Sequence, residues 1–329
     1  MSLTPSPVVL DVRDLTTTFM RPAGPVVAVD RLSLTLRRGQ TLALVGESGS
    51  GKSVTSLSLM RLLSSGQTTG EVWLHPAAGP SLELLGLEEP DMQRVRGRHM
   101  AMVFQEPMSS LNPLHSVGEQ VAEVMRWHGL ADPAQARERT LALLRQVGLS
   151  DPEARMGQHP HQLSGGMRQR VMMAQALAGN PALLIADEPT TALDVTLQAQ
   201  ILRLLRQLQE AYGMGILFIT HDMGVVAQMA DHVAVMYGGQ LVETAPVAEL
   251  FARPRHPYTR GLLAAVPRPG ARGRLHGMPG QVETVFGRPT ACRFANRCPD
   301  VQPRCRQELP ALDGSSGHRV RCFFPVRST

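Results

Sequence analysis

A glycine-rich loop between a predicted strand and a predicted helix constrains this sequence more than any other feature. Residues 46–53 read GESGSGKS, which fits the pattern G-x-x-x-x-G-K-[ST]. The apolar run Thr41–Val45 predicts a buried strand before the loop, and Lys52–Leu63 has the periodicity of a helix. Glycines let backbone N–H groups point inward around phosphate oxygens, and the helix N-terminus adds a favourable dipole. We therefore predict an α/β fold that binds phosphate, with an ordinary glycine-rich turn as the alternative.

The phosphate loop holds the only lysine in the chain. Of the 33 basic residues, 32 are arginine, and the exception is Lys52. Lysine presents a compact ammonium and arginine a planar fork, so this position favours a point charge. We expect Lys52 to bridge the β- and γ-phosphates of a nucleotide, and the Ser53 hydroxyl to bind Mg²⁺. The other residues expected to bind the nucleotide in this loop are Gly46, Glu47, Ser48, Gly49, Ser50 and Gly51.

Two adjacent acids end the apolar run LLIADE at residues 183–188. A carboxylate at the end of a buried strand can bind Mg²⁺ beside a phosphate loop, and we assign this role to Asp187. Glu188 follows directly and can polarise the attacking water as a general base. The alternative is that both acids simply end a strand at the surface. The phosphate loop in the same chain makes that alternative the less favoured one.

Two shorter motifs suggest further contacts with phosphate. Ser164, Gly165 and Gly166 precede a predicted helix, so a hydroxyl, backbone amides and a helix dipole can form a second anion site. An ordinary helix cap explains the same residues equally well. His221 follows a predicted strand and can contact a γ-phosphate, although a structural histidine before a helix is its alternative.

The order of predicted elements indicates an α/β architecture with two parts. Residues 106–163 are mostly helical by their periodicity. Composition changes near residue 251, where prolines become frequent, so we predict one domain over 1–251 and an extension over 252–329. The predicted elements include the antiparallel strands Val8–Leu15 and Val26–Leu36 and the helices Val117–His128, Met167–Ala178 and Val195–Tyr212. A further helix is predicted to begin at Asp132-Pro133 and to run to about Val147.

The predicted extension differs from the rest of the chain in charge. It carries 14 arginines and four acids, whereas residues 1–251 carry 19 basic and 24 acidic side chains. Such asymmetry can indicate contact with nucleic acid or a membrane, but a basic appendage docked on an acidic neighbour, or simply solvated, is favoured. The arginines lack interleaved aromatic residues and a recognisable binding motif, so we expect no nucleic-acid partner.

All four cysteines of the chain lie in this extension, with the spacing C-x₅-C-x₆-C-x₁₆-C. Clustered cysteines in a chain without a secretory signal indicate metal or redox chemistry rather than disulfides. Four thiolates can hold one Zn²⁺ or one 4Fe–4S cluster, but zinc sites usually contain closer pairs. Free thiols in a flexible tail are the third possibility. The candidate metal ligands are Cys292, Cys298, Cys305 and Cys322.

The order of motifs resembles that of the ATPase subunits of ABC transporters. GESGSGKS is followed by VFQEP, LSGGM, LLIADE, TALD and ITHD. The resemblance implies a mixed sheet core, an antiparallel β subdomain, a helical subdomain at about 106–163, and a head-to-tail dimer. In that dimer Ser164, Gly165 and Gly166 act on the ATP of the partner. The resemblance also implies that Gln105 contacts Mg²⁺ or water and communicates with membrane subunits. It implies Asp194 in the D-loop Ala192–Asp194 and His221 as the switch histidine. Phe19 is implied to stack on adenine, with a core phenylalanine at the end of a strand as the alternative.

The extension resembles the C-terminal region of the ATPases of dipeptide and oligopeptide importers. The resemblance is carried by HPYT at 256–259, PGQV at 279–282, CRFANRCPDVQPRC at 292–305 and GHRVRC at 317–322. Similar chains have been associated with a 4Fe–4S cluster at these cysteines, which favours the cluster over zinc. Either metal would staple a small irregular extension that lacks a large core. Thr290 and Ala291 depart from relatives that often have glycine before the first cysteine.

The resemblance implies an ATP-hydrolysing subunit that powers peptide uptake with ATP, Mg²⁺ and the cluster. Its implied partners are a second ATPase, expected to be a paralogue, two membrane-spanning permease subunits and an extracytoplasmic solute-binding protein. The sequence has no run of about 18 apolar residues and no secretory signal, so we expect a peripheral protein on the cytoplasmic face of the bacterial cytoplasmic membrane. An importer of nickel or another small solute, a soluble ABC ATPase, and a redox sensor are the alternatives.

Overall fold

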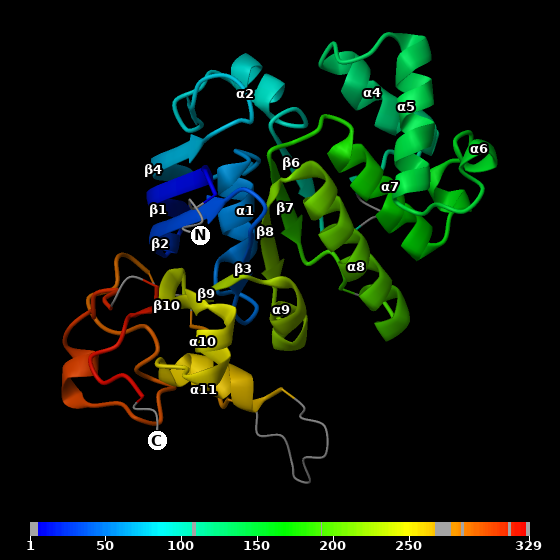
Figure 1. Ribbon diagram of the computed structural model, residues 1–329. Helices are drawn as coiled ribbons and strands as arrows, with labels where there is room; N and C mark the ends of the chain where they lie inside the picture. The colour runs from blue at the N-terminus through cyan, green and yellow to red at the C-terminus, as the bar shows by residue number, and fades with distance from the viewer. Residues whose placement is uncertain are drawn as a thin grey trace.

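The computed structural model describes residues 6–106, 110–191, 193–266, 278–283, 286–314 and 317–326. Within these ranges the chain forms two sheets with helices around them (Figure 1). The larger sheet has the strand order β11-β10-β9-β3-β8-β7-β6. Its strands are β3 (Thr41–Val45), β6 (Met100–Val103), β7 (Leu183–Asp187), β8 (Gly215–Thr220), β9 (His232–Tyr237), β10 (Gln240–Pro246) and β11 (Arg319–Val320).

The strands from β9 to β6 run parallel, whereas β10 and β11 are antiparallel to their neighbours. Every residue of β3, β7 and β8 is buried, as expected for parallel strands covered on both faces. The predicted mixed sheet is therefore confirmed. Because the carboxyl ends of parallel strands meet at one edge, the fold brings Gly46, Glu188 and His221 to the same edge.

The smaller sheet is antiparallel, with the strand order β2-β1-β4-β5. Its first strand extends beyond the predicted end at Leu15, because its ladders with β2 and β4 continue past irregularities near Asp14. The helix α1 is shorter than predicted, and Arg61 just beyond it has a left-handed φ of 52°. These elements are β1 (Val8–Arg21), β2 (Gly24–Arg37), β4 (Gln67–Leu74), β5 (Leu82–Glu83), α1 (Lys52–Leu59) and α2 (Glu89–Val95).

A helical arm lies at one end of the molecule (Figure 1). One hydrophobic core joins this arm to α8 and to the large sheet. The mainly helical character of the predicted range 106–163 is confirmed where it is described, and residues 107–109 lie outside the described ranges. The helices are α4 (Val117–Trp127), α5 (Pro133–Gln146), α6 (Pro152–Arg155), η1 (Pro160–Gln162), α7 (Gly165–Leu177) and α8 (Val195–Tyr212).

The segment after residue 251 packs on the other end of the large sheet (Figure 1). Its strand β11 pairs with β10, and one core combines Tyr237 and Leu250 with Tyr258 and Phe294. The division near residue 251 stays a prediction. In the described part of the chain, no helix is both long and apolar enough to cross a bilayer. The remaining helices are α9 (Met223–Met229), α10 (Val247–Ala252), α11 (Pro257–Ala264) and η2 (Pro303–Arg306).

Candidate functional site

The phosphate loop joins β3 to α1 and requires glycine directly before the helix. Gly51 has a φ of 105°, and a Cβ added there would lie 2.5 Å from the carbonyl oxygen of Ala28. The Lys52 ammonium donates hydrogen bonds to the carbonyl oxygens of Gly46 at 2.7 Å and Glu47 at 3.0 Å. Burial lowers the pKa of Lys52, although three nearby carboxylates oppose this shift. The loop therefore holds its one ammonium against its own backbone.

Asp187, the last residue of β7, lies against the first turns of α1. Its carboxylate accepts hydrogen bonds from the hydroxyls of Ser53 at 3.4 Å and Ser56 at 2.9 Å. Burial raises the pKa of Asp187, although these two hydrogen bonds oppose that shift. Ser53 and Asp187 thus place a hydroxyl oxygen and a carboxylate oxygen together beside the phosphate loop. Oxygen donors of this kind are the ligands that Mg²⁺ prefers.

Glu188 has a constrained backbone and a well-held side chain. Its φ of 47° is unusual for a residue other than glycine and is typical of functional positions. The carboxylate bonds to Gln105 Nε2 at 3.2 Å, Thr191 Oγ1 at 2.9 Å and His221 Nδ1 at 3.1 Å. Burial alone would raise the pKa of Glu188, but the hydrogen bonds from His221 and Thr191 and nearby positive charge lower it overall. The structure therefore brings Gln105 and His221 onto one carboxylate.

One open pocket of about 770 Å³ contains most of the predicted nucleotide-binding residues. Its volume is within the range that accommodates a small organic ligand. Ser50 does not line this pocket and is fully buried. Leu262, Ala265 and Met278, which follow residue 251, form part of its wall. The predicted residues that line it are Gly46, Glu47, Ser48, Gly49, Gly51, Lys52, Ser53, Gln105, Glu188 and His221.

Two other predicted motifs cap helices and do not line this pocket. Ser164 is the N-cap of α7 and accepts a hydrogen bond from a backbone N–H of its first turn at 3.4 Å, and Gly165 and Gly166 begin that helix. Asp194 caps α8 in the same way at 2.9 Å. Ala192, the first residue of the predicted D-loop, lies outside the described residues. Any action of these motifs on a nucleotide therefore requires a nucleotide outside this pocket.

Phe19 lies on β1, and its ring is close to Gly66. A Cβ added to Gly66 would be 2.9 Å from a ring carbon of Phe19. Phe19 is not among the residues that line the pocket. Its stacking on adenine stays a prediction.

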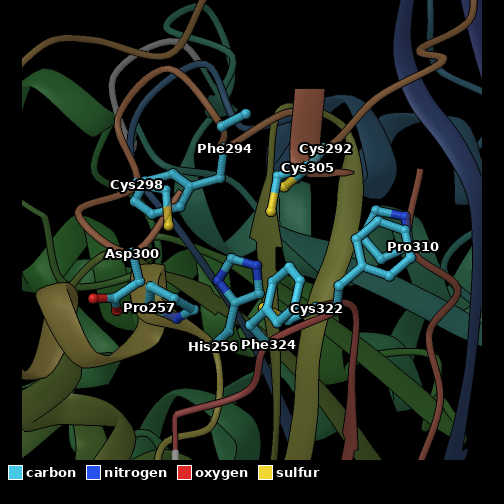
Figure 2. Close-up of a pocket in the computed structure, with 12 residues that line it drawn as sticks. His256, Pro257, Cys292, Phe294, Cys298, Asp300, Cys305, Pro310, Cys322 and Phe324 are labelled. Atoms are coloured by element: carbon cyan, nitrogen blue, oxygen red, sulfur yellow. The ribbon is translucent and has the colours of Figure 1, made fainter. Parts of the chain in front are cut away.

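The four cysteines line one small cavity (Figure 2). Its volume is about 10 Å³, roughly the space for one water molecule. The backbone N–H of Cys292 donates a hydrogen bond to the carbonyl oxygen of Cys305 at 3.0 Å. This bond directly links the chain segments that carry these two cysteines. Phe294, Phe324 and the ring of His256 also line the cavity. Among the described residues, no group of three or more His, Cys, Asp or Glu side chains has the geometry to hold a metal ion.

The cavity favours neutral thiols. Burial raises the pKa of Cys298 and of Cys322 to about 11. Burial also raises the pKa of Cys292, and the neighbouring Cys305 and Cys298 add to this shift. Since a bound cation stabilises thiolates, a metal ion among these sulfurs would reverse the preference.

Two functional contacts escaped the sequence analysis although local spacing could have indicated them. Ser56 follows Ser53 by three residues on α1, so both hydroxyls lie on one face of the helix. Thr191 follows Glu188 by three residues and donates to its carboxylate.

Two other contacts left no local signal. The Glu47 backbone N–H donates to Tyr258 Oη at 2.8 Å, and the Arg297 guanidinium donates to the Glu47 carboxylate at 2.6 and 3.1 Å. Both partners lie more than 200 positions from Glu47 along the chain. Folding alone brings them to the phosphate loop.

A phosphate loop at the carboxyl edge of a mixed sheet, with acids at the end of β7, defines a P-loop nucleotide-binding domain. Residues 29–191 match the ABC transporter family, and residues 242–305 match the family "Oligopeptide/dipeptide transporter, C-terminal region". The chain belongs to the peptide-transporter group of ABC ATPases, and its fold is the ABC ATPase cassette.

Known proteins resemble this chain over most of its length. It is 48% identical over 317 residues to the oligopeptide transport ATP-binding protein AppD of Bacillus subtilis, which covers 96% of both chains. It is 44% identical over 319 residues to the dipeptide transport ATP-binding protein DppD of Escherichia coli, with 96% of this chain and 97% of that one covered. A solved ATP-binding cassette, dimeric and bound to ADP and Pi, has a TM-score of 0.64 at 28% identity and covers 72% of this chain and 98% of that one.

Proposed function

We propose that this protein hydrolyses ATP to power the import of di- or oligopeptides through an ABC transporter. One observation carries the proposal: the phosphate loop, Asp187 and Glu188 converge at one edge of the sheet in a chain with a peptide-transporter C-terminal region. The relatives named for dipeptide and oligopeptide transport cover nearly the whole chain, the C-terminal region included.

We assign the chemistry to Glu188. Lys52 and the N–H groups of the loop bind the β- and γ-phosphates of ATP and neutralise their charge. The Glu188 carboxylate, kept ionised by its hydrogen bonds, accepts a proton from water while the water oxygen attacks the γ-phosphorus and ADP departs. Gln105 and His221 orient Glu188 and sense the γ-phosphate.

Ser53 and Asp187 fit a Mg²⁺ site. Their oxygens are 3.4 Å apart, so one ion between them could contact both. Gln105 lines the same pocket and supplies a further candidate oxygen. When bound, Mg²⁺ would neutralise charge on the phosphates.

We assign the two helix-capping motifs that do not line the pocket, around Ser164 and Asp194, to the site of a second nucleotide. Ser164, Gly165 and Gly166 expose a helix N-terminus, which suits the γ-phosphate of ATP held by a partner ATPase in a head-to-tail dimer. Asp194 belongs to the same dimer interface. The further partners are two permease subunits and an extracytoplasmic solute-binding protein, which place this chain on the cytoplasmic face of the bacterial cytoplasmic membrane.

We infer that the cysteine cavity holds a metal, and we favour a 4Fe–4S cluster over zinc. Four thiols that line one cavity form a soft donor set, which suits either metal. The cavity has room for about one water molecule, so the sulfurs must move apart when a cluster binds. The proposed ligands are Cys292, Cys298, Cys305 and Cys322, and the metal would staple the irregular extension.

The proposal is tested by purification from native membranes followed by transport. We expect mass spectrometry of the tagged protein to detect permease subunits and a second ATPase. In vesicles that contain the purified complex and its solute-binding protein, we expect ATP-dependent uptake of a labelled peptide. Uptake of Ni²⁺ in place of peptides would contradict the proposed substrate, and purification without any membrane protein would contradict the role in transport.

A further inference from the structure

Two residues of the segment after residue 251 form hydrogen bonds with one residue of the phosphate loop, Glu47. The Arg297 guanidinium donates two hydrogen bonds to the Glu47 carboxylate, from Nη1 at 2.6 Å and from Nη2 at 3.1 Å. The Arg297 side chain is only 6% exposed and that of Glu47 29%, so water screens this ion pair less than a surface pair. A bidentate pair of this kind fixes direction as well as distance.

Arg297 is itself held in place by its surroundings. Its Nε donates to the carbonyl oxygen of Pro279 at 2.8 Å, and its guanidinium carbon lies 5.7 Å from the centre of the Tyr237 ring. These contacts orient the guanidinium toward Glu47.

Tyr258 holds the backbone of the same residue. Its hydroxyl accepts the Glu47 N–H at 2.8 Å, and its fully buried ring packs against Tyr237 and Phe294 with ring centres 4.7 and 5.4 Å apart. The third polar group of Glu47, its carbonyl oxygen, accepts a hydrogen bond from the Lys52 ammonium. Two of the three polar groups of Glu47 are thus bound by the extension, and the third touches the lysine expected to bind phosphate.

We propose that Arg297 and Tyr258 are positioning residues for the phosphate loop, through which the C-terminal extension sets the affinity for ATP. The inference rests on the proposed binding of ATP at this loop. A phosphate loop must hold several N–H dipoles in one direction, and a loop already ordered before binding loses less conformational entropy when the nucleotide arrives. Arg297 and Tyr258 keep the loop ordered, and both lie in the extension rather than in a strand of the large sheet.

The test is a double-mutant cycle in the full-length protein, read by the Kd of a fluorescent, non-hydrolysable ATP analogue. We expect Arg297→Ala and Glu47→Ala each to weaken binding about tenfold, as for loss of a charge-assisted hydrogen-bond pair. We expect the double variant to bind no worse than either single variant, because Arg297 acts through Glu47. Additive losses, or unchanged binding by both single variants, would overturn the inference.

Further variants separate positioning from stability. Tyr258→Phe keeps the ring but removes the acceptor, and we expect about fivefold weaker binding. Arg304→Ala, which removes an ion pair with Glu308 inside the extension, is the control and should leave the Kd unchanged. In the assembled transporter, Arg297→Ala should raise the KM for ATP with little change in kcat. If Arg297→Ala does not fold, Arg297→Lys and Tyr258→Phe decide, and normal binding by both would overturn the inference.

The experiment also separates this inference from the proposed function. A wild-type protein that binds no ATP analogue would contradict the function itself. A wild-type protein that binds the analogue, alongside an Arg297→Ala variant that binds it equally well, would contradict the inference alone.

Discussion

The nucleotide pocket and the cysteine cavity are built by different means. The pocket, about 770 Å³, lies at the carboxyl ends of β3, β7 and β8, whose parallel ladders fix where each loop begins. The cavity, about 10 Å³, is formed mostly by segments outside helices and strands. In the first, backbone hydrogen bonds position the side chains. In the second, side-chain packing and isolated backbone hydrogen bonds, such as that between Cys292 and Cys305, do so.

This difference predicts where a single side chain matters for chemistry and where it matters for structure. In the pocket, a substitution should change binding or turnover while the sheet keeps its geometry. In the extension, one core joins Tyr258 and Phe294 to the large sheet, and a substitution should disturb local structure first.

The largest effect is expected for Glu188→Gln in the pocket. The amide keeps the size of the side chain but cannot accept a proton, so ATP hydrolysis should fall by about 10²–10⁴-fold. Binding of ATP and the temperature of unfolding should be unchanged, because β7 keeps its ladders. Hydrolysis is measured as phosphate release, with Glu210→Gln on α8 as the matched control. Undiminished hydrolysis in the Glu188 variant would remove this residue from the role of general base.

A smaller effect is expected for Lys52→Met. The change keeps the aliphatic stem but removes the ammonium, and binding of ATP should weaken about a hundredfold, as for loss of charge-assisted contacts to phosphate. Lys52→Arg should restore little of the binding, because the broad planar guanidinium of arginine does not replace the compact ammonium of lysine. The measurement is the Kd by titration calorimetry. Unchanged affinity in Lys52→Met would place the phosphates elsewhere.

Local motifs explain why much of the pocket could be predicted from the sequence. The strand before Gly46, the helix from Lys52 and the acids after the β7 run are each encoded within a few residues, and the structure places them at one edge. Periodicity also predicted α8 to its observed ends at Val195 and Tyr212. The α1 helix ends four residues before the prediction, where the left-handed Arg61 breaks the pattern.

Contacts between distant segments could not be predicted in this way. Arg297 and Glu47 are 250 positions apart, and neither carries a local feature that indicates the other. The cysteines illustrate an intermediate case. Their clustering in sequence predicted a shared site, and all four line one cavity, but spacing alone did not determine how far apart the sulfurs lie.

A third prediction tests the cysteine cavity. Cys305 is buried, and its carbonyl oxygen bonds to the Cys292 backbone, so Cys305→Ser keeps the size of the side chain but removes a soft ligand. The iron or zinc content of anaerobically purified protein should fall about tenfold or more. The temperature of unfolding should fall with it, unlike in the pocket variants. The control is Ser150→Ala, an exposed residue in the loop between α5 and α6 that is remote from the extension in sequence, which should leave both the metal content and the unfolding temperature unchanged.

The result of this metal analysis has three distinct readings. Iron with acid-labile sulfide supports the cluster, and zinc without iron supports the alternative metal. If the protein is purified without either metal, and Cys305→Ser unfolds at the same temperature as the wild type, the proposal that a metal stabilises the extension would be contradicted. That last outcome would also weaken the contrast between the nucleotide pocket and the cysteine cavity. Contacts within the protein would then be enough to keep the extension folded without a metal.

The smallest effect is expected for Thr191→Val in the pocket. Glu188 bonds to three side chains, and Thr191 supplies one neutral hydrogen bond at 2.9 Å. Its loss leaves Gln105 and His221 in place, so kcat should fall only about fivefold, as for about 1 kcal/mol. The KM for ATP should be unchanged, since Thr191 acts on the base rather than on the phosphate loop. A fall in kcat as large as that of Glu188→Gln would show instead that the carboxylate depends on this one hydroxyl, and that the sheet alone does not position the chemistry of the pocket.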